Sequence, residues 1–144
     1  MIKFVVNEEP VAQARPRVTT KNGKPRLYDP DKSKYFKQLV AMKAKQYAPE
    51  TLLDCPLLLR ITFYRSIPKN FTIAKRKQIE DGELRPITKP DIDNYVKAIK
   101  DALNKVIWTD DSKVVELHAS KFYSEYPRVV IEIRRLGDAT RFVS

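Results

Sequence analysis

The sequence predicts one α+β domain in which a small mixed or antiparallel sheet packs with helices. A chain of 144 residues has the length of one ordinary domain, and its 42% hydrophobic residues are enough for a single core. Its apolar patterns follow one another in the order strand, loop, helix, strand, helix, helix, strand, strand. We therefore expect a single domain over residues 1–136 and a C-terminal tail over residues 137–144.

The first third of the chain predicts a strand, a basic hairpin or loop, and a helix. Residues 2–6 form a short apolar run, and residues 10–30 are rich in Pro, Arg and Lys. Asn22-Gly23 lies between two runs with strand composition, which is typical of a hairpin turn. A helix should begin at Asp31 and end near Tyr47. Its apolar positions at helical spacing are Tyr35, Phe36, Leu39, Val40 and Met42.

The middle of the chain predicts a strand, a short basic helix and a loop. Residues 57–65 alternate in the manner of a strand with one buried face. Residues 72–80 have helical composition, and residues 81–90 contain Gly82, Pro86 and Pro90, which favour a loop. The side chains expected on the buried face of the strand are Leu57, Leu59, Ile61 and Phe63.

The last third predicts an amphipathic helix followed by two strands. The helix covers residues 91–104. Trp108 follows this helix and should pack in the core beneath the acidic turn at Asp110-Asp111. Strands at 113–122 and 128–135 are separated by only a few residues, which predicts that they pair as a hairpin. The expected buried stripe of the helix is Ile92, Val96, Ile99 and Leu103, with Tyr95 beside it.

The charge distribution favours a polyanionic partner, most often a nucleic acid. The formal net charge is +10, yet residues 91–111 carry five Asp against three Lys. An acidic segment binds phosphate poorly by charge alone. A divalent cation held between the carboxylates and the phosphate would allow this acidic segment to act on a polyanionic partner. The alternative is a basic protein whose charge only keeps it in solution.

Several classes of site and location are excluded or made unexpected by the sequence. A single cysteine, Cys55, excludes an internal disulfide, and together with the single His118 it excludes a Cys/His zinc site within one subunit. Three glycines cannot build a Gly-rich phosphate loop. No apolar run reaches membrane-spanning length and the first residues lack a secretory core, so we expect a cytoplasmic protein without membrane association.

The strongest candidate for chemistry is the beginning of the amphipathic helix. Asp91 and Asp93 lie near its N-terminus, where backbone N–H groups favour anionic groups. Mg²⁺ would relieve the repulsion of two close carboxylates and keep coordination positions for water and phosphate oxygens. Asp110-Asp111, just before a strand, could supply a third carboxylate, and Lys97 could stabilise charge on a scissile phosphate.

Each of these features also has a structural explanation. Asp91 could only cap the helix, Asp93 and Lys97 could only form a surface pair, and Asp110-Asp111 could only form a turn. The combination within residues 91–111 of a strongly basic chain is harder to explain in that way, so both interpretations stay open at this point.

Residues 89–111 also resemble the RusA family of Holliday junction resolvases, which is often found in prophages. The family pattern is P-D-x-D-N-x-x-K, then D-A-L-N, then a Val/Trp-rich step into D-D. The family also has an N-terminal strand followed by a basic R-P-R segment, and the N-terminal part of this chain resembles it. Lys121 and the Pro127-Arg128 pair fit the last two strands of the family. The residues that match are Arg15-Pro16-Arg17, Pro90, Asp91, Asp93, Asn94, Lys97, Asp101-Ala102-Leu103-Asn104, Trp108 and Asp110-Asp111.

The resemblance implies a RusA-like fold and a homodimeric endonuclease that cuts four-way DNA junctions symmetrically in DNA recombination and repair. It implies Mg²⁺ as the cofactor, with Mn²⁺ as the alternative metal. By position, Asp91, Asp93 and Asp111 would be catalytic metal ligands, Asp110 a further candidate ligand, and Lys97 the catalytic lysine.

Basic side chains outside the acidic cluster are candidates for DNA contacts through phosphate. Each could instead belong to a solvated basic face. The functional alternatives are a basic nucleic-acid-binding protein without catalysis, and a nuclease for other branched DNA. The candidate DNA-binding residues are Arg15, Arg17, Lys21, Lys24, Arg26, Lys75, Arg76, Lys77, Lys89 and Lys121.

Overall fold

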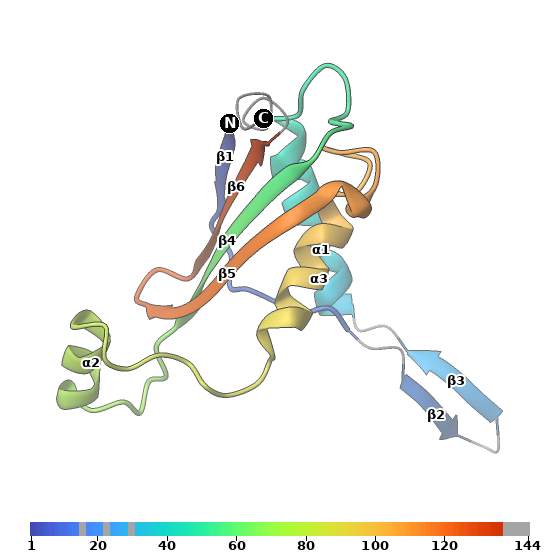
Figure 1. Ribbon diagram of the computed structural model, residues 1–144. Helices are drawn as coiled ribbons and strands as arrows, with labels where there is room; N and C mark the ends of the chain where they lie inside the picture. Colours follow the sequence, from blue (N-terminus) through green and yellow to red (C-terminus); the bar gives the residue numbers. More distant parts are fainter. Residues whose placement is uncertain (15–16, 22–23, 29–30, 137–144) are drawn as a thin grey trace.

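The computed structural model confirms an α+β architecture with a mixed sheet (Figure 1). It describes residues 1–14, 17–21, 24–28 and 31–136, and for 17–21 and 24–28 it describes the strands without their side chains. The predicted tail at 137–144 lies outside the described residues. The elements are β1 (Ile2–Val6), β2 (Arg17–Lys21), β3 (Lys24–Tyr28), α1 (Asp31–Lys45), β4 (Leu57–Ser66), α2 (Ile73–Glu80), α3 (Ile92–Leu103), the 3₁₀ turn η1 (Asp111–Lys113), β5 (Val114–Ser124) and β6 (Arg128–Arg135).

The main sheet has four strands in the order β1-β6-β4-β5. β4 is central: it pairs antiparallel with β6 and parallel with β5, so that Ile61 lies between Ile131 and Ala119. β1 pairs antiparallel with the other side of β6. Among the described strands, β5 therefore forms one edge of this sheet.

The predicted hairpin between the last two strands is wrong. β5 and β6 follow each other in the chain, yet β4 lies between them. The physical reason is the apolar character of β4, in which Leu57, Leu59, Ile61 and Phe63 are all fully buried. A strand with such a face is most stable in the centre of a sheet, where neighbours on both sides shield it from water.

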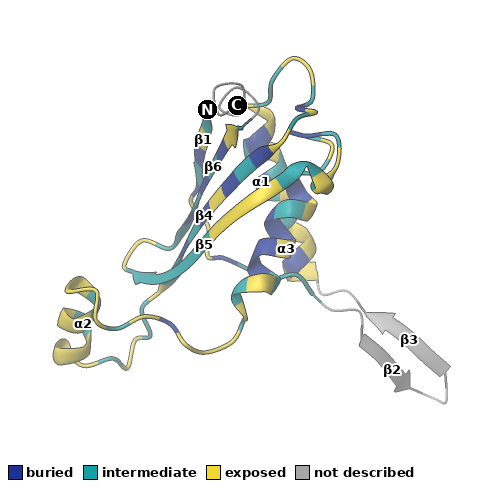
Figure 2. Ribbon diagram, viewed as in Figure 1, coloured by how far each residue is buried: buried dark blue, intermediate teal, exposed yellow. Residues whose placement is uncertain are grey.

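The core lies between one face of the sheet and the helices α1 and α3 (Figures 1 and 2). In α3 the predicted stripe is buried at Val96, Ile99 and Leu103, whereas Ile92 is only half-buried. In α1 the expectation fails for Tyr35 and Met42, each 63% exposed. The helix instead buries Ser33, Phe36, Val40 and Ala44, which lie on one face at i, i+3, i+7 and i+11.

Two elements lie outside this core. β2 and β3 pair antiparallel with each other, which confirms the predicted basic hairpin, although its turn lies outside the described residues. α2 begins after Thr72, whose side chain accepts a hydrogen bond from the Lys75 amide, and it buries none of its residues. Figure 1 shows α2 and the β2–β3 hairpin projecting from different sides of the body. None of the described helices has the length and hydropathy needed to cross a membrane.

The connection between α3 and β5 confirms the prediction for Trp108. Its side chain is fully buried, and its backbone forms a bridge with Leu53. The indole Nε1 donates a hydrogen bond to Asp111 Oδ1 at 2.9 Å. A core residue therefore fixes the position of one carboxylate of the acidic turn.

The core assignment predicts unequal effects of two isoleucine truncations. Ile99→Ala should lower the free energy of unfolding by about 2–5 kcal/mol, because Ile99 is fully buried on α3. Ile73→Ala, at a position 88% exposed on α2, should change it by less than about 0.5 kcal/mol. Urea unfolding followed by circular dichroism measures both, and equal losses would contradict the packing of α3.

Candidate functional site

An open cleft of about 540 Å³ lies where the start of α3 meets the edge strand β5. Asp91 and Asp93 line it from the helix, and Lys121 lines it from the strand. The other lining residues are Arg85, Pro86, Ile87, Ile92, Ala119 and Ser120. Another hollow, beside Met1 and Arg134, is lined by none of the sequence-predicted site residues.

The two carboxylates at the helix start are exposed and available to a ligand. Asp91 occupies the N-cap position in an extended conformation, with φ −67° and ψ 149°. Its side chain makes no capping hydrogen bond to the described first turn of the helix. Asp93 lies in that turn and is also exposed. A role as helix cap therefore does not explain why residue 91 carries a carboxylate.

Lys121 holds the loop that leads into this helix. Its ammonium donates hydrogen bonds to the carbonyl oxygens of Thr88, at 3.2 Å, and of Pro90, at 3.1 Å. Burial lowers the pKa of Lys121, and nearby Arg65 lowers it further, while Asp91 acts in the opposite direction. The ammonium thus binds backbone carbonyls beside the cleft, and a DNA contact by the same group stays a prediction.

Two arginines that sequence reasoning missed contribute to the same loop. Arg65 Nη1 donates to the Thr88 carbonyl oxygen at 3.2 Å. Arg85 Nε donates to the carbonyl oxygen of Lys121 at 3.0 Å, and its guanidinium lies 4.0 Å from the centroid of the Phe122 ring. No local sequence pattern marks these residues, because their partners are more than twenty positions away.

The other polar residues of α3 have separate positions. Lys97 is exposed one turn after Asp93, and no ion pair between the two occurs among the described side chains. Asp101 pairs with Lys37 at 2.9 Å and so links α3 to α1. Asn94 contributes its backbone oxygen, which accepts a hydrogen bond from the Gln13 amide at 2.9 Å.

The second acidic pair lies beyond the opposite end of α3. Asp110 is exposed and its carboxylate accepts a hydrogen bond from the Ser112 amide at 2.9 Å. Hydrogen bonds from Ser112 lower the pKa of the Asp110 carboxyl. Asp111 is half-buried, and its Oδ1 is held by Trp108. Asp110 thus stabilises a turn, and Oδ2 of Asp111 has no hydrogen-bond partner among the described residues.

The structure therefore brings together Asp91 and Asp93 but not all four predicted acidic residues. Asp91 and Asp93 lie at the first turn of α3, which is 12 residues or about 18 Å long, and Asp110 and Asp111 follow its other end. In the described part of the chain, no group of three or more Asp, Glu, His or Cys side chains could hold one metal ion. Asp110 and Asp111 are thus absent from the lining of the cleft that Asp91 and Asp93 share.

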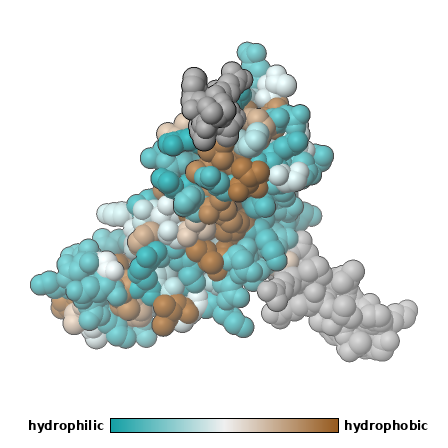
Figure 3. Space-filling view, viewed as in Figure 1, coloured by the Kyte–Doolittle hydropathy of each residue, from teal (hydrophilic) through white to brown (hydrophobic). Residues whose placement is uncertain are grey.

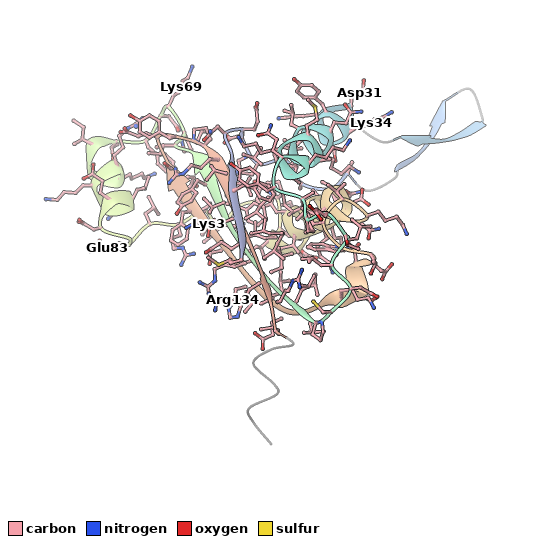
Figure 4. All side chains as sticks on the ribbon, turned by 90° about the horizontal axis from the view of Figure 1, so that it is seen from above. Lys3, Asp31, Lys34, Lys69, Glu83 and Arg134 are labelled. Atoms are coloured by element: carbon pink, nitrogen blue, oxygen red, sulfur yellow. The ribbon has the colours of Figure 1, made fainter. Side chains whose placement is uncertain are left out.

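The candidate DNA-binding residues are only partly described. Lys75 lies 4.9 Å from the centroid of the Phe71 ring, and Arg76 Nε donates to the Phe71 carbonyl oxygen. Lys77 and Lys89 are exposed. Figure 4 shows Lys69 and Glu83 on the segments that flank α2. Arg15 and the side chains of Arg17, Lys21, Lys24 and Arg26 lie outside the described residues.

Comparisons with known proteins give one family model and two relatives that cover nearly the whole chain. The family model described as "Endodeoxyribonuclease RusA" matches residues 7–134. The chain is 55% identical over 138 residues to "Uncharacterized protein YqaN" of Bacillus subtilis (strain 168), covering 94% of this chain and 97% of that protein. It is 28% identical over 135 residues to "Crossover junction endodeoxyribonuclease rusA" of Lactococcus phage r1t, covering 91% of this chain and 94% of that protein.

The contacts of Lys121 predict that it stabilises the loop beside the cleft. Lys121→Met keeps the length of the side chain but removes two charge-assisted hydrogen bonds, so it should lower the free energy of unfolding by about 1–2 kcal/mol. Lys69→Met, at an exposed position, should change it by less than about 0.5 kcal/mol. Urea unfolding measures both, and an unchanged Lys121 variant would contradict this role.

Proposed function

The chain belongs to the RusA family of endodeoxyribonucleases, and we propose that it is a divalent-metal-dependent nuclease that resolves four-way DNA junctions. Its proposed cofactor is Mg²⁺, with Mn²⁺ as the alternative metal, and its proposed role is in DNA recombination and repair. The relative from Lactococcus phage r1t, whose printed name is that of a crossover junction endodeoxyribonuclease, supports the choice of substrate.

The observation that supports this proposal best is the pair of carboxylates at the start of α3. Asp91 and Asp93 line one cleft, and both are exposed. Such oxygens fit a hard divalent cation, which takes one or two carboxylates and completes its coordination with water and phosphate oxygens. A metal bound there would supply an activated water and neutralise charge on the scissile phosphate.

The chain's own residues would orient the substrate. The N-terminus of α3 lies at the cleft, which its first residues line, and the backbone N–H groups of a helix N-terminus favour a phosphate there. Lys97, exposed one turn further along α3, can reach a phosphate held at the helix start and stabilise the charge that develops on it. No covalent nucleophile is needed for this reaction.

A second subunit would complete the metal site, which supports the proposal of a homodimer. The edge strand β5 carries the exposed side chains Val115, 60% exposed, and Leu117, 47% exposed. Figure 3 shows a hydrophobic strip over the region where Figure 1 shows β5. An edge strand with exposed apolar side chains readily pairs with another chain.

Antiparallel pairing of two β5 strands would bring the separated acids together. In a register centred on Glu116, Val115 lies opposite the partner's Leu117, and residue 111 lies opposite residue 121. Asp111 of one subunit would then approach the cleft of the other. Repulsion between the two copies of Glu116 costs about 0.2–1 kcal/mol, less than burial of four apolar side chains contributes.

A two-fold dimer also suits the proposed substrate. A four-way junction has near two-fold symmetry, so two related clefts could each act on one of two opposed strands. The net charge of +10 favours phosphate contacts, and binding through them would weaken steeply with added salt.

Replacing Asp91 should separate cleavage from binding. Asp91→Asn should lower cleavage of a labelled four-way junction in Mg²⁺ at least about 100-fold, because it weakens metal binding at the cleft. Junction affinity without metal should stay within about threefold of the wild type, since no basic contact is removed.

The matched control is Glu83→Gln, at an exposed acid three residues after the end of α2, and it should leave cleavage unchanged. Near wild-type cleavage by the Asp91 variant would defeat the proposed site.

Parallel reactions on forks, flaps and linear duplex distinguish a junction resolvase from a nuclease for other branched DNA. Absence of cleavage by the wild type on all of them would favour a binding protein without catalysis.

Mixed dimers test whether Asp111 acts in the partner's cleft. Asp91→Asn and Asp111→Asn should each inactivate the homodimer. In a heterodimer of the two variants, one of the two clefts would contain an intact Asp91 and an intact Asp111, so nicking of one strand should return to about half the wild-type rate. A heterodimer as inactive as both homodimers would show that the acids act within one chain.

A further inference from the structure

Arg85 is fixed in an unusual way at the edge of the cleft. It is exposed, it lines the same cavity as Asp91 and Asp93, and its Nε donates to the Lys121 carbonyl oxygen at 3.0 Å. Its guanidinium carbon lies 4.0 Å from the centroid of the Phe122 ring. One hydrogen bond and one contact with an aromatic ring thus restrain the guanidinium.

The ring beneath Arg85 is itself fixed by a stacked array across three strands. Phe122 of β5 stacks on Tyr64 of β4, with centroids 5.7 Å apart and planes inclined by 25°. Arg128 of β6 lies over Tyr64 at 3.8 Å, and its Nη1 donates to Ser124 Oγ and to the Tyr126 carbonyl oxygen. We call Arg85, Phe122, Tyr64 and Arg128 the arginine–aromatic array.

The array leaves the outer edge of the Arg85 guanidinium available. Among the described side chains Arg85 forms no ion pair, and the hydrogen bond of its Nε is the one that its guanidinium makes there. The two terminal nitrogens can therefore donate to a ligand. Two N–H donors in one plane match the two non-bridging oxygens of a phosphodiester.

The other basic residue of the cleft lining is differently placed. The Lys121 ammonium donates to two backbone carbonyls, and its pKa is lowered by burial. Arg85 therefore offers the cleft the free cationic donor that Lys121 does not. Cation–aromatic contact also reduces the side-chain freedom that a phosphate contact would otherwise remove.

We propose that Arg85 binds a backbone phosphate of DNA beside the Asp91–Asp93 cleft and positions the strand for hydrolysis. This inference rests on the proposed function for the reaction, whereas the phosphate contact itself requires only that the chain binds DNA. Phe122 acts as a positioning residue, because its ring restrains the Arg85 guanidinium.

The experiment compares Arg85→Ala and Arg85→Lys with Arg134→Ala. Arg134 is an exposed arginine of β6 that lines the hollow away from the cleft (Figure 4). Affinity for a labelled four-way junction is measured in EDTA over a range of salt concentrations, and cleavage is measured separately in Mg²⁺. Unfolding in urea confirms that each variant is folded.

Arg85→Ala should weaken junction binding about tenfold and reduce the slope of log affinity against log salt by about one. Arg85→Lys should recover the salt slope but not the cleavage rate, because an ammonium cannot make the two-pronged contact. Phe122→Leu should retain the salt slope and lower kcat more than it raises KM. Arg134→Ala should differ little from the wild type.

Binding and cleavage by Arg85→Ala equal to those of Arg134→Ala would overturn the proposal. Full recovery of cleavage by Arg85→Lys would overturn the two-pronged contact. Failure of the proposed function gives a different result, since the wild type would then bind the junction without cutting it in Mg²⁺. In that case the EDTA binding series would still decide whether Arg85 contacts phosphate.

Discussion

The contact on which the site depends is the one between the Lys121 ammonium and the carbonyl oxygens of Thr88 and Pro90. It ties the loop before α3 to the edge strand β5, directly before the residue that begins the helix. Arg65 and Arg85 add hydrogen bonds to the same junction of loop and strand. These bonds use backbone atoms of the loop, and the carboxylates of Asp91 and Asp93 are exposed in the described part of the chain.

The acidic residues of this basic chain are divided between the two ends of one helix. Asp91 and Asp93 lie at one end, while Asp111 is held at the other by the buried Trp108. Under the proposed dimer, a two-fold partner paired along the edge strand β5 would reverse the direction of the strand and bring one end of each subunit to the other end of its partner. At the cleft, Lys121 is occupied by backbone carbonyls, whereas the exposed Arg85 lies at the edge where a phosphate backbone could reach it.

Local patterns predicted most of the fold and the carboxylates of the site. The alternation in β4, the amphipathic stripe of α3 and the burial of Trp108 each follow from residues close in sequence. The pairing of β5 and β6 was predicted wrongly, because the choice of neighbour depends on how much apolar surface β4 buries and not on chain order. Arg85 and Lys121 acquire their positions from residues more than thirty places away, and no periodicity reveals such contacts.

Binding of Mn²⁺ to the isotopically labelled protein, followed by the broadening of backbone amide signals, tests the central claim most directly. A paramagnetic ion held by the start of α3 should broaden the amides of residues 91–95 and 119–121 first. In the dimer it should broaden the amides of residues 110–112 as strongly as those of residues 91–95, whereas within one chain the length of α3 separates the two groups and the broadening of residues 110–112 should be much weaker. Unchanged signals at residues 91–95, with broadening elsewhere or none at all, would contradict the claim that these carboxylates hold the metal.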